Sequence, residues 1–160
     1  MRNYEFRTLT KQDLPQLGSW LQLPHVKVWW GDAEQQVALI EKDMNNTAVD
    51  MLIVALSGRP FAYIRHHDAH LFQMPEYGDL PVGTRVIATF VGDPDFLGQG
   101  HAVGYIETFI RDLRLHYPLV AVAAGTTDTR MIGVYSQAGF HKRRFAPTSD
   151  GRLVQVMTHH

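Results

Sequence analysis

The chain has no cysteine among its 160 residues, and this absence excludes several kinds of chemistry. Without cysteine there is no disulfide framework, no thiol nucleophile and no thiolate ligand for a metal ion. No charge of one sign dominates either, because 15 basic residues stand against 16 acidic ones and leave a formal net charge of -1. We therefore expect no nucleic-acid partner and no membrane partner that would require a basic surface.

Long hydrophobic runs are also missing. No apolar stretch approaches the roughly 20 residues that a membrane span needs. Residues 1–5 lack the apolar core of a signal peptide, so we expect a cytoplasmic protein. With 45% hydrophobic and 19% charged residues, the composition is typical of a globular protein, and we expect a single domain over residues 1–160.

The most informative stretch covers residues 87–102, which read Ile-Ala-Thr-Phe-Val-Gly-Asp-Pro-Asp-Phe-Leu-Gly-Gln-Gly-His-Ala. Its β-branched and aromatic beginning predicts a strand, and Gly-Asp-Pro-Asp interrupts that strand. A helix is predicted next, because apolar residues recur at spacings of three and four: Val103, Ile106, Ile110 and Leu113. The unpaired N–H groups at the start of this helix, beside two glycines, favour an anion such as a pyrophosphate.

Two well-known phosphate motifs are absent from this stretch. It contains neither Gly-x-Gly-x-x-Gly followed by a distant acid nor Gly-Lys-Ser/Thr, so nucleotide binding of those kinds is not expected. The alternative for Gly98-Gln99-Gly100 is a tight connection that binds nothing, since Gly-x-Gly before a helix is common.

Hydrophobic periodicity predicts an α+β fold, a mixed and largely antiparallel sheet with helices on both faces. The predicted order is β-α-α-β-β-β-α-β-α-β-β. The elements besides those above are strands at residues 4–9, 51–56, 61–67, 118–123, 143–146 and 153–157, and helices at 11–21, 32–43 and 128–138. Pro15 falls inside the first of these helices. Either the helix begins one turn later than residue 11, or its first turn tolerates the missing N–H of Pro15.

The last helix has a characteristic end. Asp128 is expected to cap its N-terminus, and Gly139 supplies a left-handed C-cap. Met131, Ala138 and either Val134 or Tyr135 form its buried stripe. This pattern is structural in the first instance.

Both motifs resemble those of the GNAT acetyltransferase superfamily. The loop resembles the acetyl-CoA pattern Gln/Arg-x-x-Gly-x-Gly/Ala, in which Gly100 and Ala102 match and Leu97 departs. The run from Asp128 to Phe140 resembles Asn-x-x-Ala-x-x-x-Tyr-x-x-x-Gly-Phe, with Tyr135 at the tyrosine position. The predicted order of elements is also the GNAT order.

One branch of the superfamily is most similar, the aminoglycoside 6'-N-acetyltransferases together with the siderophore hydroxylamine acyltransferases. The resemblance rests on Pro24-His25-Val26, Trp29-Trp30, residues 90–100 and residues 135–140. It implies transfer of an acetyl group from acetyl-CoA, by direct attack, to the amine of a small molecule, without a metal. The protein would be a monomer or a homodimer.

The resemblance also implies site residues. Tyr135 would protonate the departing thiolate. The cofactor would contact Phe90, Val91, Leu97, Gly98, Gln99, Gly100, His101, Ala102 and Asp128. The substrate would lie against His25, Trp29, Trp30, Glu76, Asp79 and Ala88.

The chain departs from the aminoglycoside enzymes at two acids that help to hold the cationic substrate. The matching positions are Ala88 and Ala123. Each missing charge-assisted hydrogen bond is worth about 1.5–3 kcal/mol, so we expect aminoglycosides to be poor acceptors. Glu76 and Asp79 are the nearest acids in sequence that would compensate, although an exposed loop acid is more often only a solvated group.

Several alternatives stay open. His66, Asp68 and His70 would share one strand face if the strand continued that far, as a base, a metal site or, preferably, a solvated strand end. A capping or packing role for His25 is favoured over catalysis. Trp29 and Trp30 are expected to divide between core and substrate wall, because neighbours on an extended segment face opposite sides. The alternative to an acetyltransferase, from another functional class, is a non-catalytic regulatory domain that binds acyl-CoA.

Overall fold

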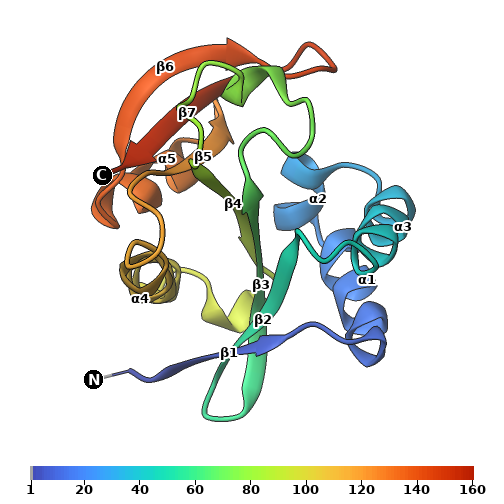
Figure 1. Ribbon diagram of the computed structural model, residues 1–160. Coiled ribbons are helices and arrows are strands. Elements are labelled where there is room, and N and C mark those ends of the chain that lie inside the picture. The colour runs from blue at the N-terminus through green and yellow to red at the C-terminus, as the bar shows by residue number, and fades with distance from the viewer. Residues whose placement is uncertain (1) are drawn as a thin grey trace. The chain divides into compact units, whose positions relative to one another are not determined.

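The computed structural model describes residues 2–160, and Figure 1 shows its elements. The strands are Tyr4–Thr8 (β1), Asp50–Leu56 (β2), Arg59–Asp68 (β3), Arg85–Val91 (β4), Val120–Gly125 (β5), His141–Pro147 (β6) and Leu153–His159 (β7). The helices are Leu14–Gln22 (α1), Pro24–Trp30 (α2), Ala33–Asp43 (α3), His101–Leu113 (α4) and Thr129–Gln137 (α5). Short 3-10 turns lie at Lys11–Asp13 (η1), Pro75–Tyr77 (η2) and Pro94–Phe96 (η3).

The strands follow the order β1-β2-β3-β4-β5-β7-β6. Three of the strand pairs, β1 with β2, β5 with β7 and β6 with β7, are antiparallel, whereas β4 and β5 are parallel. The predicted α+β class with a mixed, largely antiparallel sheet is confirmed. The structure has one helix more than predicted, α2.

The chain divides into two compact units. Residues 1–65 and 89–99 form the first unit, and residues 66–88 and 100–160 form the second. Among the described residues, no helix combines the length and the apolarity that crossing a membrane requires.

The first unit begins with a capped turn. The carboxylate of Asp13 accepts hydrogen bonds from the backbone N–H of Thr10 at 2.8 Å and from the Arg7 guanidinium at 2.7 and 2.9 Å. Thr10 followed by an acid three residues later is the sequence pattern of a capping box, and Asp13 completes that box here. Because α1 starts at Leu14, after η1, Pro15 falls in its first turn, where the missing N–H costs little.

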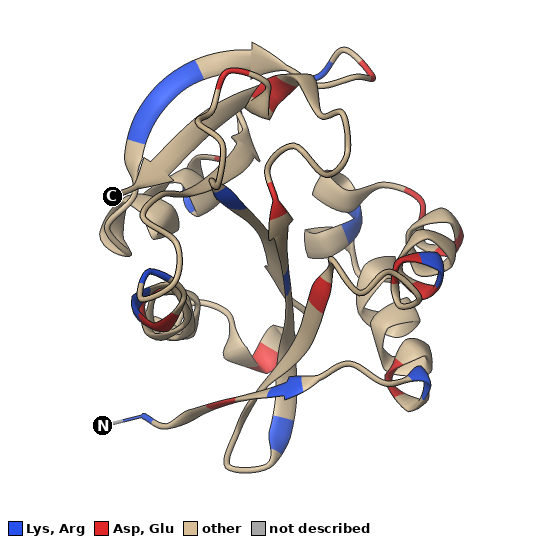
Figure 2. Ribbon diagram, viewed as in Figure 1, with Lys and Arg blue, Asp and Glu red and all other residues tan. Residues whose placement is uncertain are grey.

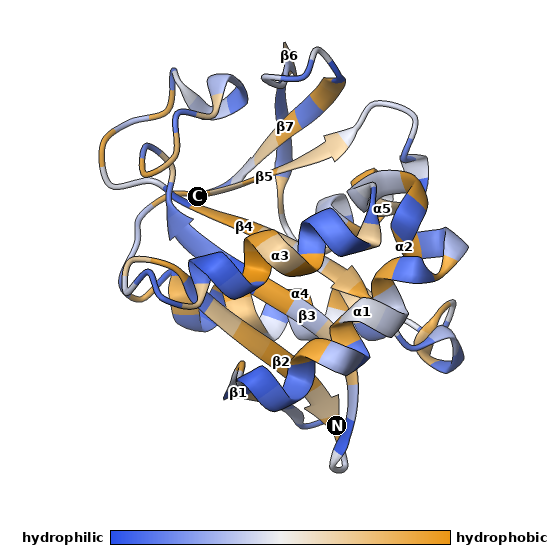
Figure 3. Ribbon diagram, turned by 90° about the vertical axis from the view of Figure 1, so that its right-hand side faces the viewer, coloured by the Kyte–Doolittle hydropathy of each residue, from blue (hydrophilic) through white to orange (hydrophobic). Residues whose placement is uncertain are grey.

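Hydrophobic stripes of α1 and α3 build the core of the first unit. Leu17 and Leu21 of α1 and Ile40 of α3 are fully or almost fully buried. In Figure 3 the ribbon of α3 alternates between apolar and polar stretches, as expected of an amphipathic helix. Gly92 lies so close to the Trp20 ring that a Cβ there would approach it to 2.1 Å, so the packing itself requires a glycine.

The second unit has its own apolar cluster beneath the loop of residues 69–84. Buried members of this cluster include Tyr77 and Leu80 of the loop, Val86 of β4, Ala121 of β5 and Val156 of β7. Two prolines and two glycines in residues 68–83 predict a loop, but that loop is only partly irregular, because η2 buries Tyr77 against strands.

The parallel register of β4 and β5 is short. It joins Arg85 with Val120 and Val86 with Ala121, whereas β5 continues to Gly125. The strand predicted at residues 118–123 is therefore shifted by two residues. One amide beyond this register, the backbone N–H of Ala123, is hydrogen-bonded to the hydroxyl oxygen of Tyr77.

Candidate active site

The loop before α4 is shaped by two glycines. Gly98 and Gly100 have φ values of 74° and 79°, in the left-handed region that favours glycine. Gly100 is the N-cap of α4, and its carbonyl accepts the backbone N–H of Gly104 at 3.1 Å. The N–H groups of Ala102 and Val103 precede that first intrahelical bond, so they can face an acceptor at the helix start.

Two hydrogen bonds of Gln99, one from its side chain and one to its backbone carbonyl, hold this loop in place. Gln99 Nε2 donates to the carbonyl of Asp95 at 3.1 Å, and the carbonyl of Gln99 accepts a hydrogen bond from Arg2 at 2.9 Å. Leu97 is half-buried, whereas Gly98, Gln99 and Gly100 are exposed. The loop therefore presents its glycines to solvent while its ends are tied down.

At the start of α4 the side chains turn inward. His101 and Ala102 are both buried, with exposed fractions of 6% and 7%. Since neither side chain projects into solvent, the backbone N–H groups are the polar groups that this end of the helix offers. The peptide dipoles of the 13 residues of α4 are aligned, with the positive end at this N-terminus, and this favours binding of an anion there.

Tyr135 is buried on α5. Only 3% of it is exposed, and its ring packs edge-to-face against Phe140 with centroids 5.7 Å apart. Burial, together with Tyr105, Tyr77 and Asp128, raises the pKa of Tyr135 well above its ordinary value. Its hydroxyl therefore stays protonated at neutral pH. Of the two residues predicted for the buried stripe, Tyr135 is the buried one and Val134 is half-buried.

Asp128 caps α5 as predicted. Its Oδ1 accepts the backbone N–H of Met131 at 3.3 Å. Burial raises the pKa of Asp128, although the Met131 hydrogen bond and the charge of Arg130 act in the opposite direction. At the other end of α5, Gly139 adopts a φ of 101°, which is the predicted left-handed C-cap.

His25 is anchored to the end of β4. Its Nε2 donates to the carbonyl of Val91 at 3.0 Å. This contact fits the packing role that the sequence favours for His25. Trp30 of the same helix packs edge-to-face against Phe90, with ring centroids 5.0 Å apart. His25, Trp30, Phe90 and Val91 are therefore brought together within the first unit.

The reason given for dividing Trp29 and Trp30 between core and wall was wrong. It assumed an extended segment, but both residues lie in α2, where neighbours are separated by about 100° around the helix axis. Both side chains are half-buried. Their exposure does not distinguish a core residue from a wall residue.

The two loop acids have different surroundings. Glu76 is buried, with 6% exposed, so it is not the exposed loop acid that its sequence position suggested. Asp79 accepts hydrogen bonds from Arg144 at 3.1 Å, and Arg143 lies 3.5 Å from its carboxylate. Although burial raises the pKa of Asp79, these two arginines outweigh it and leave the pKa below its ordinary value.

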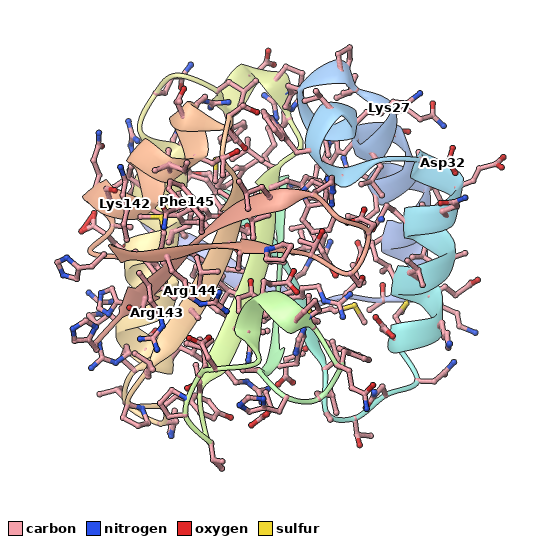
Figure 4. The ribbon with its side chains drawn as sticks, turned by 90° about the horizontal axis from the view of Figure 1, so that it is seen from above. Lys27, Asp32, Lys142, Arg143, Arg144 and Phe145 are labelled. Atoms are coloured by element: carbon pink, nitrogen blue, oxygen red, sulfur yellow. The ribbon has the colours of Figure 1, made fainter. Side chains whose placement is uncertain are left out.

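The arginines that engage Asp79 belong to a basic run on β6. Figure 2 shows this run along the strand, and Figure 4 labels its residues Lys142, Arg143 and Arg144 together with the neighbouring Phe145. The third predicted acceptor position near this loop in sequence, Ala88 on β4, is half-buried and carries no polar group.

His66, Asp68 and His70 do not share one strand face, because β3 ends at Asp68. His66 Nδ1 accepts a hydrogen bond from Arg85 at 2.8 Å, and His70 Nε2 donates to the carbonyl of Leu80 at 2.8 Å. Across residues 2–160, no three His, Asp or Glu side chains are grouped so as to hold a metal ion.

Tyr77 was not identified from the sequence. It is buried in the second unit, and it is one of the groups that raise the pKa of Tyr135. The available signal was an aromatic residue inside a loop otherwise rich in proline and glycine. Its partner is a backbone N–H 46 residues further along the chain, which no local pattern reveals.

Comparisons with known proteins agree with this geometry. At the sequence level the chain is 24% identical to aminoglycoside N(6')-acetyltransferase type 1 of Klebsiella pneumoniae, over 94% of the chain and 80% of that protein. At the structural level it resembles the acetyltransferase AAC(6')-Ib in complex with ribostamycin and coenzyme A, with a TM-score of 0.85, 23% identity, and coverage of 98% of this chain and 93% of that one.

A more distant structure has the same fold. The spermidine N-acetyltransferase of Vibrio cholerae, in complex with coenzyme A and spermine, has a TM-score of 0.73 at 13% identity, covering 97% of this chain and 94% of that one. The family model described as an acetyltransferase (GNAT) domain matches residues 10–147. The resemblance predicted from the sequence is thereby confirmed, and the chain belongs to the GNAT family of acetyltransferases.

Proposed function

We propose that the protein transfers an acetyl group from acetyl-CoA to the amine of a small molecule. The observation that carries this proposal is the loop in which Gly98 and Gly100, both at positive φ, precede the long helix α4. Such a helix start binds the phosphates of a cofactor through backbone N–H groups alone. The single domain expected over residues 1–160 stays a prediction.

The cofactor would be held mainly by its pyrophosphate. The N–H groups of Ala102 and Val103 would donate to phosphate oxygens, and the absence of a side chain at Gly98 and Gly100 would let the phosphates approach. The other positions assigned to the cofactor are Phe90, Val91, Leu97, Gln99 and Asp128. The cofactor supplies the reactive thioester.

The chain's own chemistry then concerns a proton. A neutral amine attacks the thioester carbonyl, the carbon–sulfur bond breaks, and the amine nitrogen loses one proton while the sulfur needs one. Tyr135 is the proposed donor to sulfur, because its raised pKa keeps the hydroxyl protonated at neutral pH. The proton from the amine goes to solvent, since no side chain has been assigned as a base.

Aminoglycosides are proposed to be poor acceptors. Ala88 and Ala123 carry no charge where the aminoglycoside enzymes have acids, and Asp79 is already paired with Arg144. A polycationic substrate would therefore meet few unpaired carboxylates. The relatives whose structures contain ribostamycin or spermine bind such cations. Because this chain lacks the two acids, we expect its acceptor to be a less cationic amine.

Substitution at residue 88 tests this assignment. Ala88→Asp should raise the specificity constant for a kanamycin-like aminoglycoside about tenfold or more, since one charge-assisted hydrogen bond is worth roughly 1.5–3 kcal/mol. Ala88→Asn is the matched control, because it has nearly the same shape without the charge. Efficient acetylation of aminoglycosides by the unmodified protein would contradict the assignment.

Thiol release from acetyl-CoA tests the function itself. The acceptor panel should contain aminoglycosides, polyamines, amino acids, hydroxylamines and peptides. An amine should give the fastest release, whereas preference for a hydroxylamine would favour the siderophore-type reaction. Tight acetyl-CoA binding without release for any acceptor would instead indicate a non-catalytic acyl-CoA-binding domain.

A further inference from the structure

The second unit contains a groove that the proposed acetyl transfer does not use. Its volume is about 590 Å³, and it is lined by α4, by Arg114 at the C-cap of α4, by Ala138 after α5 and by His159 of β7. Pockets of roughly 300–1,000 Å³ are the usual size for small ligands. The groove is therefore large enough for more than a water molecule or a single ion.

One wall of the groove is formed by an arginine that is hydrogen-bonded to a histidine. Arg114 Nη1 and His159 Nδ1 are 2.7 Å apart. Because a guanidinium can only donate, Nδ1 accepts, and the ring proton of an uncharged His159 lies on Nε2. Burial, followed by the charges of Arg114, His141 and His160, lowers the pKa of His159, which agrees with an uncharged ring.

A second nitrogen of Arg114, Nε, lacks an acceptor. This nitrogen is buried, and among residues 2–160 it has no hydrogen-bond partner. In a guanidinium, Nε–H and one N–H of Nη2 point the same way and together bind an oxyanion through two parallel hydrogen bonds. A buried donor without an acceptor costs about 1–3 kcal/mol, so an oxygen ligand at this edge would recover stability.

Charge in the groove also favours an anion. Arg111 adds a second guanidinium, one turn before Arg114 on α4, and Glu107 is the carboxylate that lines the groove. The side chain of Arg111 is 74% exposed, and its 3.7 Å contact with Asp112 is the kind of surface pair worth less than about 1 kcal/mol. Positive charge is therefore in excess.

We propose that this groove binds a small phosphate monoester, with Arg111 and Arg114 holding the phosphate. The site is separate from the loop proposed for acetyl-CoA. Along α4, Arg111 lies about 16 Å and Arg114 about 21 Å from Gly100, from a rise of about 1.5 Å per residue. The proposal is independent of the acceptor and of Tyr135.

Calorimetry on the full chain tests it, with glycerol phosphate and inorganic phosphate as probes. Glycerol phosphate should bind saturably, and Arg111→Gln should weaken this binding at least tenfold, as expected for loss of a charge-assisted contact. Arg152→Gln, which removes an exposed arginine of the β6–β7 loop, is the matched control and should bind as the unmodified protein does.

Arg114→Gln should abolish binding, and its thermal unfolding must be compared because it also loses the contact with His159. Arg111 is exposed, so its variant remains informative if the Arg114 variant fails to fold. The proposal is wrong if glycerol phosphate does not bind, if only inorganic phosphate binds, or if Arg111→Gln behaves like the control. Displacement of glycerol phosphate by coenzyme A but not by dephospho-coenzyme A would also overturn it, because the groove would then belong to the cofactor.

Discussion

A single buried hydroxyl, that of Tyr135, carries the proposed proton transfer. Burial raises its pKa, and nearby Tyr105, Tyr77 and Asp128 act in the same direction. A tyrosine in this state cannot serve as a base near neutral pH, because it holds its proton too firmly. It remains a hydrogen-bond donor, which is what a thiolate leaving group needs.

Replacement of Tyr135 by phenylalanine should therefore depress the chemical step. General acid assistance is worth roughly 10²–10⁴ in rate, and Tyr135→Phe keeps the ring that packs against Phe140. Single-turnover rates are the measurement, since slow product release can hide the loss in kcat. Acetyl-CoA affinity and thermal stability should change little.

The matched control is Tyr63→Phe, which removes a hydroxyl from another fully buried ring, in the first unit. It should leave the single-turnover rate unchanged. A Tyr135→Phe variant that retains the full rate would assign this residue to packing alone.

Residue identities were predictable where a local pattern defines them. Asp128, Tyr135 and Gly139 follow from the spacing and caps of one helix together with a family resemblance. The pairing of Asp79 with Arg144 joins residues 65 positions apart. Such a contact depends on how β6 and the loop pack, so no local sequence pattern reveals that the carboxylate of Asp79 is already paired.

Among the elements, α2 shows how a pattern was misinterpreted. The sequence pattern predicts no helix here and places Trp29 and Trp30 on an extended segment, although Pro24 and Gly31 flank them. In the structure Pro24 and Gly31 are the boundaries of a helix, since Pro24 is its first residue and Gly31, with a φ of 85°, is its C-cap. Proline is well suited to the first turn, and glycine to the position after the last. The same two residues thus mark a short helix.

The loop before α4 is the element on which cofactor binding depends. Gly100→Val should abolish acetyl-CoA binding, because a branched side chain would stand where the phosphates approach the N–H groups and because valine disfavours a φ of 79°. Calorimetric titration of acetyl-CoA is the measurement. Unchanged affinity would make the loop a simple turn.

Strain alone must be separated from loss of the site. Gly151→Val is the control, since Gly151 has a φ of 85° in an exposed hairpin loop and its Cβ would meet no atom within 4 Å. It imposes similar backbone strain without touching the predicted phosphate loop. Both variants should lose comparable thermal stability, and only Gly100→Val should lose acetyl-CoA.

At the scale of the whole molecule, class and approximate element order were predictable, but exact boundaries were not. The two-residue shift of β5 arises because Pro118 and Leu119 belong to the apolar run but precede the strand. Strand order follows from pairing between distant segments. In particular, β7 lies between β5 and β6, which requires tertiary contacts that periodicity does not encode.

Buried tyrosines should make the whole molecule sensitive to alkali. Burial raises the pKa of Tyr63 to about 12, and the pKa values of Tyr77 and Tyr135 are also raised mainly by burial. In the unfolded chain a tyrosine ionises near pH 10. These groups therefore contribute full stability below about pH 10, and that contribution is lost as the pH rises above it, because the unfolded state releases protons that the folded state retains.

The expected loss for each such tyrosine is at most about 1.4 kcal/mol per pH unit between pH 10 and its folded-state pKa. Urea unfolding at pH 9, 10, 11 and 11.5 measures it, and tyrosinate absorbance should rise together with unfolding for the buried rings. Tyr63→Phe should reduce the pH slope of the unfolding free energy by up to about 1.4 kcal/mol per pH unit between pH 10 and about 12. A folded protein whose stability is constant up to pH 11.5, or a Tyr63→Phe variant with an unaltered slope, would contradict this account.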